Sequence, residues 1–251
     1  MHADDRHATG VSNTGWPRPE VSRVEFPVVL FDLFDTLVPG GTREQRDAIS
    51  SDVGRELGVD GPAFAQLVSD TLEDRMRGRL GDLAATLFEL AARLGSQPSV
   101  EAVARAVTMR LDLNRSLLQA SWALPVLDQL RADGVTIGVV SDCSAETPAV
   151  WHETALAARV TAKAFSCELG VRKPDPEMYL SVTRALSVRP QQCVFVGDGA
   201  GGELAGARAL GMRTIWFDNN DRAGIRHSNK NFSWDDERIT SLTQLRELLH
   251  S

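Results

Sequence analysis

The sequence predicts an α/β fold in which a Rossmann-like parallel sheet core carries an inserted α-helical domain. Three observations lead to this prediction. An apolar run over residues 28–31 ends on a carboxylate, as a buried parallel strand can. About eighty residues with helical periodicity follow it. From residue 123 onward helices and strands alternate, which is typical of a parallel sheet covered on both faces.

Composition limits the classes of function that the chain can have. Its 251 residues, 43% of them hydrophobic, suffice for one large domain or for a core with an inserted module. The formal net charge of -7 argues against nucleic acid or an anionic membrane as the main partner. No apolar stretch approaches the ~18 residues of a transmembrane helix. Three cysteines without paired spacing, Cys143, Cys167 and Cys193, favour reduced thiols and a cytoplasmic protein.

The inserted segment is predicted to contain four helices. Residues 1–24 precede the first strand; they are polar, lack the hydrophobic region of a secretory signal, and are expected to form a flexible tail. Thr42 suits the N-cap of the first inserted helix, and Gly58 and the Gly61-Pro62 pair separate it from the second. The predicted helices are 42–57, 62–76, 82–94 and 100–117.

The second half of the chain alternates short helices with apolar strands, with Gly or Pro at several junctions. Units of this size favour right-handed crossovers in a parallel sheet. A polar loop is expected from 218 to about 237, and a short amphipathic helix over 239–249 closes the chain. The predicted helices are 125–132, 147–158, 176–186 and 203–210, and the predicted strands are 135–140, 162–166, 193–196 and 213–217.

Polar side chains stand where several of these strands end. Asp32 follows the first strand, Ser141 follows the second, and Asp198 follows the strand at 193–196. Ligands of open α/β sheets bind outside the carboxyl ends of the strands. A carboxylate there can act as a nucleophile and can also ligate a hard cation. Capping of a turn is the alternative role for Asp32 and Ser141.

Four segments, in chain order, resemble the motifs of the haloacid dehalogenase (HAD) superfamily. Asp32-Leu33-Phe34-Asp35-Thr36-Leu37 is similar to motif I, and Val139-Val140-Ser141 to motif II. The segment 165–176, with Lys173, resembles motif III, and Val194-Phe195-Val196-Gly197-Asp198, with Glu203, resembles motif IV. The resemblance covers residues from about 27 to 217 and implies a HAD-like core with an α-helical cap of subclass I. We expect the core over 25–39 and 121–251 and the cap over 40–120.

The resemblance implies a Mg²⁺ site and a covalent intermediate. Asp32 would attack phosphorus and form an aspartyl-phosphate. Mg²⁺ prefers an octahedral shell of oxygen ligands, and the family pattern supplies a carboxylate oxygen of Asp32, the backbone carbonyl of Phe34, and Asp198. Glu203 would hold a metal-bound water or complete the shell, although a Glu at a helix start also suits the helix dipole.

The resemblance also implies a phosphate-binding set. Ser141 and Lys173 would bind the equatorial phosphate oxygens and offset their charge. Backbone amides around Phe34 and Asp142 could add donors. Lys173 is one of only three lysines in the chain, which favours a ligand role over an ordinary surface position. The implied substrate is a small anionic, phosphorylated molecule, and the oligomeric state stays open.

One position departs from the pattern of HAD phosphatases. These enzymes usually carry a second Asp two residues after the nucleophile as general acid/base, and this chain has Phe34 there. Such proton transfer is typically worth ~10²–10⁴-fold in rate. The missing acid favours a slow enzyme, one with good leaving groups, or one that takes an acid from cap or substrate. Asp35 is one residue too far along to substitute directly.

Superfamily members without this acid offer alternatives. Phosphonoacetaldehyde hydrolases use a cap lysine, and residues 40–120 contain none. The 2-haloacid dehalogenases have an aromatic residue two places after the nucleophile, as here, and an early cap arginine, for which Arg43 and Arg46 are the candidates. They use no metal, whereas Asp198 beside Asp32 argues for one. The third possibility is a HAD-shaped binding or regulatory protein with little turnover.

Three cap arginines could meet an anionic substrate: Arg75, Arg77 and Arg79. Such a run is more typical of a solvated helix face, especially with acidic residues beside it. We therefore predict a Mg²⁺-dependent hydrolase with a helical cap, most simply a phosphatase that acts through Asp32.

Overall fold

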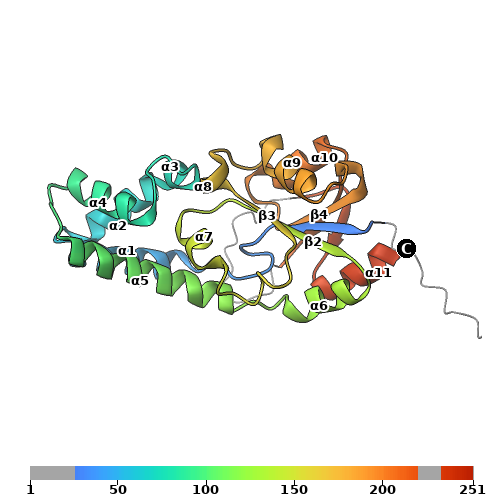
Figure 1. The fold of residues 1–251 in the computed structure, drawn as a ribbon, viewed down its shortest axis with the longest axis horizontal. Helices are drawn as coiled ribbons and strands as arrows, with labels where there is room; N and C mark the ends of the chain where they lie inside the picture. The colour runs from blue at the N-terminus through green and yellow to red at the C-terminus, as the bar shows by residue number, and fades with distance from the viewer. Residues whose placement is uncertain (1–25, 220–232, 251) are drawn as a thin grey trace, which may run out of the picture.

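The computed structural model describes residues 26–219 and 233–250. Within these ranges an α/β part is built on one sheet, and a group of helices projects from it (Figure 1). This arrangement confirms the predicted fold class. The predicted tail over 1–24 and residues 220–232 of the predicted loop lie outside the described residues. None of the helices in the described ranges combines the length and the apolar character that crossing a membrane requires.

In the described part of the chain, the sheet has six parallel strands in the order β3-β2-β1-β4-β5-β6. The first apolar run forms β1, one of the two central strands, and all four of its residues are buried, as predicted. Phe31 lies opposite Val139 on one side and Val196 on the other, so three strands end at the same edge. The strands are β1 (Val28–Phe31), β2 (Thr136–Ser141), β3 (Ala162–Phe165), β4 (Cys193–Gly197), β5 (Arg213–Phe217) and β6 (Glu237–Ile239).

The sequence does not predict β6, and the helix expected over 239–249 is wrong in its first part. A 3₁₀ turn, η3 (Leu242–Gln244), and the short helix α11 (Leu245–His250) follow β6 instead. Only Ile239 of the three residues in β6 is buried, so no apolar run marks the strand. Its pairing with β5 holds it in place, together with the ion pair that Arg213 makes to Glu237 at 2.7 Å.

Helices cover both faces of the sheet. Alternate residues of β1 belong to two apolar clusters: Val29 packs with residues of α6, α7 and α11, and Leu30 packs with residues of α9 and α10. The elements are α6 (Leu124–Ala132), α7 (Glu146–Trp151), α8 (Ser166–Leu169), α9 (Pro176–Ala185) and α10 (Glu203–Ala209), with the 3₁₀ turns η1 (Pro190–Gln192) and η2 (Ala200–Gly202).

The helix predicted over 147–158 ends at Trp151. The Thr154 hydroxyl donates to the Trp151 carbonyl at 2.7 Å and accepts from the Ala157 amide at 3.2 Å. These side-chain bonds compete with the helical backbone pattern and favour the turns that follow.

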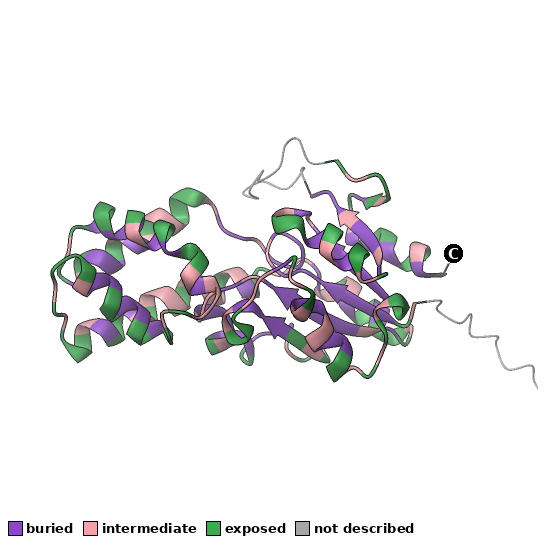
Figure 2. Cartoon of the chain, turned by 90° about the horizontal axis from the view of Figure 1, so that it is seen from above, coloured by how far each residue is buried: buried purple, intermediate pink, exposed green. Residues whose placement is uncertain are grey.

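Five helices form the projecting cap: α1 (Arg43–Glu56), α2 (Gly61–Asp70), α3 (Leu72–Met76), α4 (Leu83–Arg93) and α5 (Val100–Gln119). Thr42 is the N-cap of α1, as predicted, in a capping box with Gln45. Their inward faces share an apolar core that includes Phe64 and Leu90, and their outward faces are exposed (Figure 2). The helix predicted over 62–76 is divided at Thr71, whose hydroxyl donates to the Leu67 carbonyl at 2.7 Å.

The cap contacts the core at two places. On α5, Arg110 makes a buried ion pair at 2.6 Å with Glu146 of α7. After α3, the loop at Gly78 lies so close to α8 that a Cβ at this glycine would be 2.2 Å from the Cys167 carbonyl oxygen. Gly78 also has a φ of +65°, a conformation that glycine adopts without strain.

Candidate active site at the carboxyl edge of the sheet

The backbone brings two of the predicted carboxylates to one edge of the sheet. Asp32 directly follows β1, and its amide donates to the Val196 carbonyl of β4 at 2.9 Å. Asp198 directly follows β4, and its carboxylate accepts from the Ala200 amide at 3.0 Å. The two residues therefore start from adjacent strands that are hydrogen-bonded to each other, as the sequence pattern predicts.

Glu203, at the start of α10, completes a cluster of three carboxylates. One oxygen from each of Asp32, Asp198 and Glu203 lies within 4.8 Å of the others. The Glu203 carboxylate accepts from the Gly199 amide at 3.0 Å, so it closes the loop between β4 and α10. A Cβ at Gly197 would lie 2.0 Å from this carboxylate, which explains why glycine ends β4.

Lys173 reaches the same cluster from the loop after α8. Its ammonium contacts the carboxylate of Asp32 and lies 2.5 Å from Glu203 Oε2. Its side chain is only 4% exposed, and its backbone amide donates to the Asp142 carboxylate at 3.0 Å. Burial alone would lower the pKa of Lys173, but the charges of Asp32 and Glu203 outweigh it and hold the pKa well above its usual range. Lys173 is therefore charged at neutral pH.

The three carboxylates have more negative charge than Lys173 compensates. Burial raises the pKa of Asp32 to about 6, with Lys173 lowering it and Asp198 raising it further. Burial also raises the pKa of Asp198 and, more strongly, that of Glu203. Three carboxylates face one ammonium, and the atoms that could ligate a metal ion are all carboxylate oxygens. This set fits a hard divalent cation, which would remove the like-charge repulsion.

Ser141 ends β2 with its side chain fully buried. Its hydroxyl has no hydrogen-bond partner among the described residues, although buried hydroxyls usually have one. The same is true of Thr36, which the sequence analysis does not single out although it belongs to the first motif. Because the Ser141 hydroxyl makes no bond to the turn after β2, the turn-capping role is not observed.

Phe34, which occupies the position of the missing acid, and the next residue, Asp35, have different surroundings. Phe34 lines a cavity between core and cap. Asp35, with a φ of +64°, accepts from the Gly40 amide at 2.7 Å and so helps to shape the loop that leads to the cap. That Asp35 does not stand in for an acid at position 34 stays a prediction.

The cavity has a volume of about 450 Å³ and lies between α1, α2, α3 and α5 on the cap side and the loop after β2 on the core side. Ligand pockets commonly have volumes of roughly 300–1,000 Å³. Phe34 and Asp142 lie at its core end, close in sequence to Asp32 and Ser141. The rest of its wall combines polar residues, including Arg75, Asn114 and Ser144, with apolar residues of the cap such as Val68 and Leu113.

Arg75 differs from the two arginines that follow it. Arg77 and Arg79 make ion pairs at the cap surface, with Glu73 at 2.5 Å and Asp74 at 2.9 Å. Arg75 is only 8% exposed, so the solvated-face interpretation is wrong for this residue. The signal in the sequence is weak: Arg75 continues the buried spacing of residues 64, 68 and 71 across the break between α2 and α3.

The two candidates for a dehalogenase-type arginine, Arg43 and Arg46 of α1, both line this cavity. Arg43 has an 82% exposed side chain and pairs with Asp47 at 3.3 Å. Arg46 donates to the carbonyl oxygens of Gly40 and Gly41 at 2.9 and 2.8 Å.

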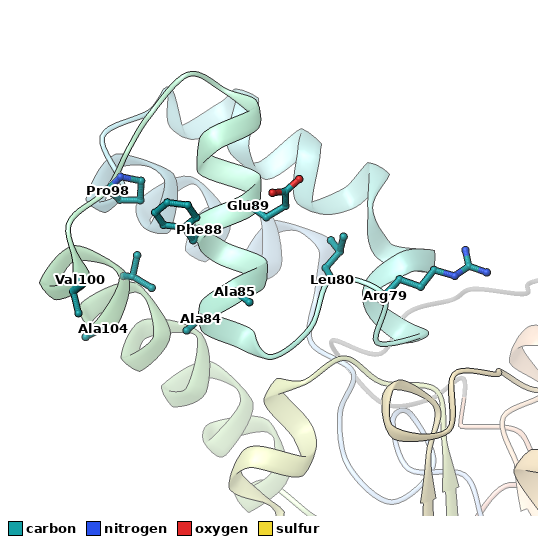
Figure 3. Close-up of a pocket in the computed structure, with 10 residues that line it drawn as sticks. Arg79, Leu80, Ala84, Ala85, Phe88, Glu89, Pro98, Val100 and Ala104 are labelled. Carbon is teal, nitrogen blue, oxygen red and sulfur yellow. The ribbon is translucent and has the colours of Figure 1, made fainter.

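A second hollow, of about 750 Å³, lies at the end of the cap that is remote from the sheet (Figure 3). Its wall is mainly apolar, with Phe88 of α4 beside Pro98 and Val100 at the start of α5, whereas the Arg79 side chain extends away from them. It lacks the converging polar groups of an active site.

Comparisons with known proteins agree on one family. The haloacid dehalogenase-like hydrolase family matches residues 26–211. A glyceraldehyde 3-phosphate phosphatase of Methanopyrus kandleri is 28% identical over 197 residues, which cover 74% of this chain and 82% of the relative. A ribulose-1,5-bisphosphate 5-phosphatase of Halopiger xanaduensis is 26% identical over 230 residues, or 88% of this chain and 96% of the relative.

Solved structures share the fold. A 2-haloacid dehalogenase from Pseudomonas syringae pv. Tomato superposes with a TM-score of 0.62 at 24% identity, over 89% of this chain and 98% of that one. A HAD phosphatase from Thermococcus onnurineus superposes with a TM-score of 0.58 at 21% identity, over 88% and 97%. At these identities the structures establish the architecture, and both chemistries occur on it.

Proposed function

The chain belongs to the haloacid dehalogenase-like hydrolases, and within this family we propose that it is a Mg²⁺-dependent phosphatase acting on a small phosphorylated metabolite. The observation that carries the proposal is the cluster of Asp32, Asp198 and Glu203, whose carboxylate oxygens lie within 4.8 Å of one another. A metal-independent dehalogenase would have to keep this repulsion uncompensated in a buried site. Curated relatives named as phosphatases support the same choice.

Asp32 is the proposed nucleophile. A carboxylate oxygen of Asp32 forms a bond to phosphorus, the bond from phosphorus to the ester oxygen breaks, and that oxygen leaves with the electron pair. Water then attacks phosphorus in the aspartyl-phosphate, which releases inorganic phosphate and restores the Asp32 carboxylate. The contact between Lys173 and Asp32 keeps the attacking carboxylate ionised, since it opposes the effect of burial on the pKa.

The surrounding residues are proposed to hold the metal ion and the phosphoryl group. Asp32, Asp198 and Glu203, with the backbone carbonyl of Phe34, would hold Mg²⁺, which would supply positive charge against the phosphoryl oxygens. Lys173 and the unpartnered hydroxyl of Ser141 would donate to the same oxygens. Backbone amides at Phe34 and Asp142 could add donors.

Phe34 sets a limit on the substrate. Without an acid at this position, the leaving oxygen departs without direct protonation by a neighbouring carboxyl group. The proposal therefore expects acyl and aryl phosphates to react faster than alkyl phosphates, because their leaving groups are more stable as anions.

The test is phosphate release from acetyl phosphate and p-nitrophenyl phosphate, with Mg²⁺ and with EDTA. Asp32→Asn should abolish Mg²⁺-dependent release, whereas the control Asp128→Asn, a surface carboxylate paired with Arg159, should leave it unchanged. Release that EDTA does not reduce, or that survives Asp32→Asn, would refute the proposal. Metal-independent halide release from 2-chloropropionate would favour the dehalogenase alternative, and absence of any turnover would favour the binding or regulatory one.

A further inference from the structure

Arg75 is a buried guanidinium without an acidic partner of its own. Its Nη2 donates to the Val68 carbonyl at 2.9 Å, and its Nη1 makes a long contact of 3.3 Å to the Ser144 hydroxyl. Its Nε is buried without an acceptor, and Arg75 makes no ion pair with any residue that the structure describes. Buried charges are normally paired with an opposite charge, so this guanidinium lacks its counterion.

Glu146 is the carboxylate whose charge acts on Arg75, and it already pairs with Arg110. Arg110 Nη2 and Nε both donate to the same oxygen, Glu146 Oε1, at 2.6 and 3.0 Å. Arg75, Arg110 and Glu146 together carry one uncompensated positive charge. Burial lowers the pKa of Arg75 to about 10, with Glu146 opposing and Arg110 adding to the shift, so the group remains charged at neutral pH.

This positive charge faces the cavity between core and cap, which reaches the candidate active site at Asp142, the acceptor for the Lys173 amide. Arg75, Asn114 and Ser144 line the wall formed by the cap and the loop after β2, and Phe34 and Asp142 line the core end. The Asn114 carbonyl oxygen is also buried and has no donor among the described residues, while its amide nitrogen contacts the Thr147 hydroxyl at 3.4 Å. A ligand that fills the cavity would therefore meet a cation and a free hydrogen-bond acceptor beyond its phosphoryl group.

We propose that Arg75 is a specificity-determining residue that binds a carboxylate on the leaving group of the substrate, with Asn114 accepting from a hydroxyl beside it. The substrate class is thus a small phosphorylated hydroxy acid. A carboxylate would replace the long contact to Ser144 with a charge-assisted hydrogen bond. One carboxylate would balance the single net positive charge that Arg75, Arg110 and Glu146 have together. The inference rests on the proposed function for the position of the phosphoryl group.

The test compares two ligands that differ only at the far end. 3-Phosphoglycerate has a carboxylate where glycerol 3-phosphate has a hydroxymethyl group. Their dissociation constants would be measured by calorimetry with Mg²⁺ on the Asp32→Asn protein, which cannot turn them over. We expect 3-phosphoglycerate to bind roughly ten- to a hundredfold more tightly. Adding Arg75→Gln should remove this difference in affinity and leave the dissociation constant of glycerol 3-phosphate unchanged. Arg75→Lys should retain part of the difference.

The matched control is Arg79→Gln, which removes an exposed cap arginine and should change neither constant. Equal affinities of the two ligands would overturn the inference. This comparison needs no substitution at Arg75, so it remains possible if Arg75→Gln does not fold. Equal weakening of both ligands by Arg75→Gln would show a purely structural role. A further comparison uses ribulose 1,5-bisphosphate and ribulose 5-phosphate, which differ by a second phosphate. If Arg75 strengthens the binding of the bisphosphate, while 3-phosphoglycerate binds no more tightly than glycerol 3-phosphate, the anion that Arg75 binds is a phosphate. The assignment of a carboxylate then fails.

The binding measurement is independent of turnover. If the wild-type protein releases no phosphate but the affinity difference persists, the proposed function fails alone. If Mg²⁺-dependent release is found and the affinities are equal, the specificity of Arg75 fails alone.

Discussion

Glu146 joins the core to the cap, and its removal should destabilise the protein strongly. Its side chain is 5% exposed and accepts two hydrogen bonds from Arg110. Burial would raise the pKa of Glu146, but Arg110 and Arg75 outweigh it and lower the pKa from 4.5 to about 2. At about 1.4 kcal/mol per unit of pKa, this difference corresponds to about 3 kcal/mol of folding stability at pH 7. Breaking a buried ion pair from one side typically costs a similar ~3–5 kcal/mol.

The dependence on pH follows from the direction of this shift. Because the pKa of Glu146 is lower in the folded state, its contribution is present in full well above pH 4.5 and is lost as the pH falls toward 2. At pH 3.5, one unit below the unfolded pKa, the contribution should be smaller by about 1.4 kcal/mol than at pH 7.

Urea unfolding of the wild type and Glu146→Gln at pH 7 and pH 3.5 measures both effects. The control is Glu153→Gln, which removes an exposed carboxylate that joins the same region to α5 through Arg115 and should shift the midpoint little. In a double-mutant cycle, the combined Arg110→Gln and Glu146→Gln protein should be more stable than the sum of the single losses implies. The reasoning is refuted if Glu146→Gln resembles Glu153→Gln, or if its cost is the same at both pH values.

Three further substitutions or additions test the active site. Ser141→Ala should lower kcat by roughly 10²–10³-fold while urea unfolding shows little change, since the hydroxyl makes no bond to lose; a large loss of stability would indicate a structural role. Mg²⁺ at about 100 times its Kd should stabilise the protein by about 2.7 kcal/mol, seen as a higher Tm, and Asp198→Asn should reduce this shift; an equal shift in both proteins would place the metal elsewhere. Phe34→Asp should raise the ratio of alkyl to acyl phosphate hydrolysis by restoring an acid, and an unchanged ratio would show that the leaving oxygen is protonated by another group.

The core could be predicted because its signals are local. A fully buried parallel strand is a continuous apolar run, so β1, β2 and β4 and the polar residues at their ends are visible in the sequence. Once these strands are adjacent, the positions of Asp32 and Asp198 follow from the topology. β6 has no such signal, because it is short and only Ile239 is buried; pairing with β5 creates it.

The cap side of the cavity could not be predicted in the same way. Arg75 and Arg77 are two residues apart, and only the break at Thr71 and the packing of α3 decide that the first is buried. Arg110 and Glu146 are 36 residues apart, with no pattern that relates them. Burial of a charged side chain is a property of the assembled fold, and a sequence that shows a run of arginines beside acids predicts a solvated face.

The charges of the acidic cluster and of the cap side of the cavity support the proposed phosphatase over the dehalogenase alternative. In the core, the negative charge of three carboxylates is larger than the positive charge of Lys173, so a bound cation would reduce their repulsion. These carboxylates belong to Asp32, Asp198 and Glu203. On the cap side, the positive charge of Arg75 and Arg110 is larger than the negative charge of Glu146, so a bound anion would balance the difference. A haloacid offers one carboxylate and a neutral carbon–halogen bond, so it would leave the acidic cluster uncompensated. A phosphorylated acid that binds with Mg²⁺ offers a cation at one end and a carboxylate at the other, and it is the ligand class that satisfies both groups at once.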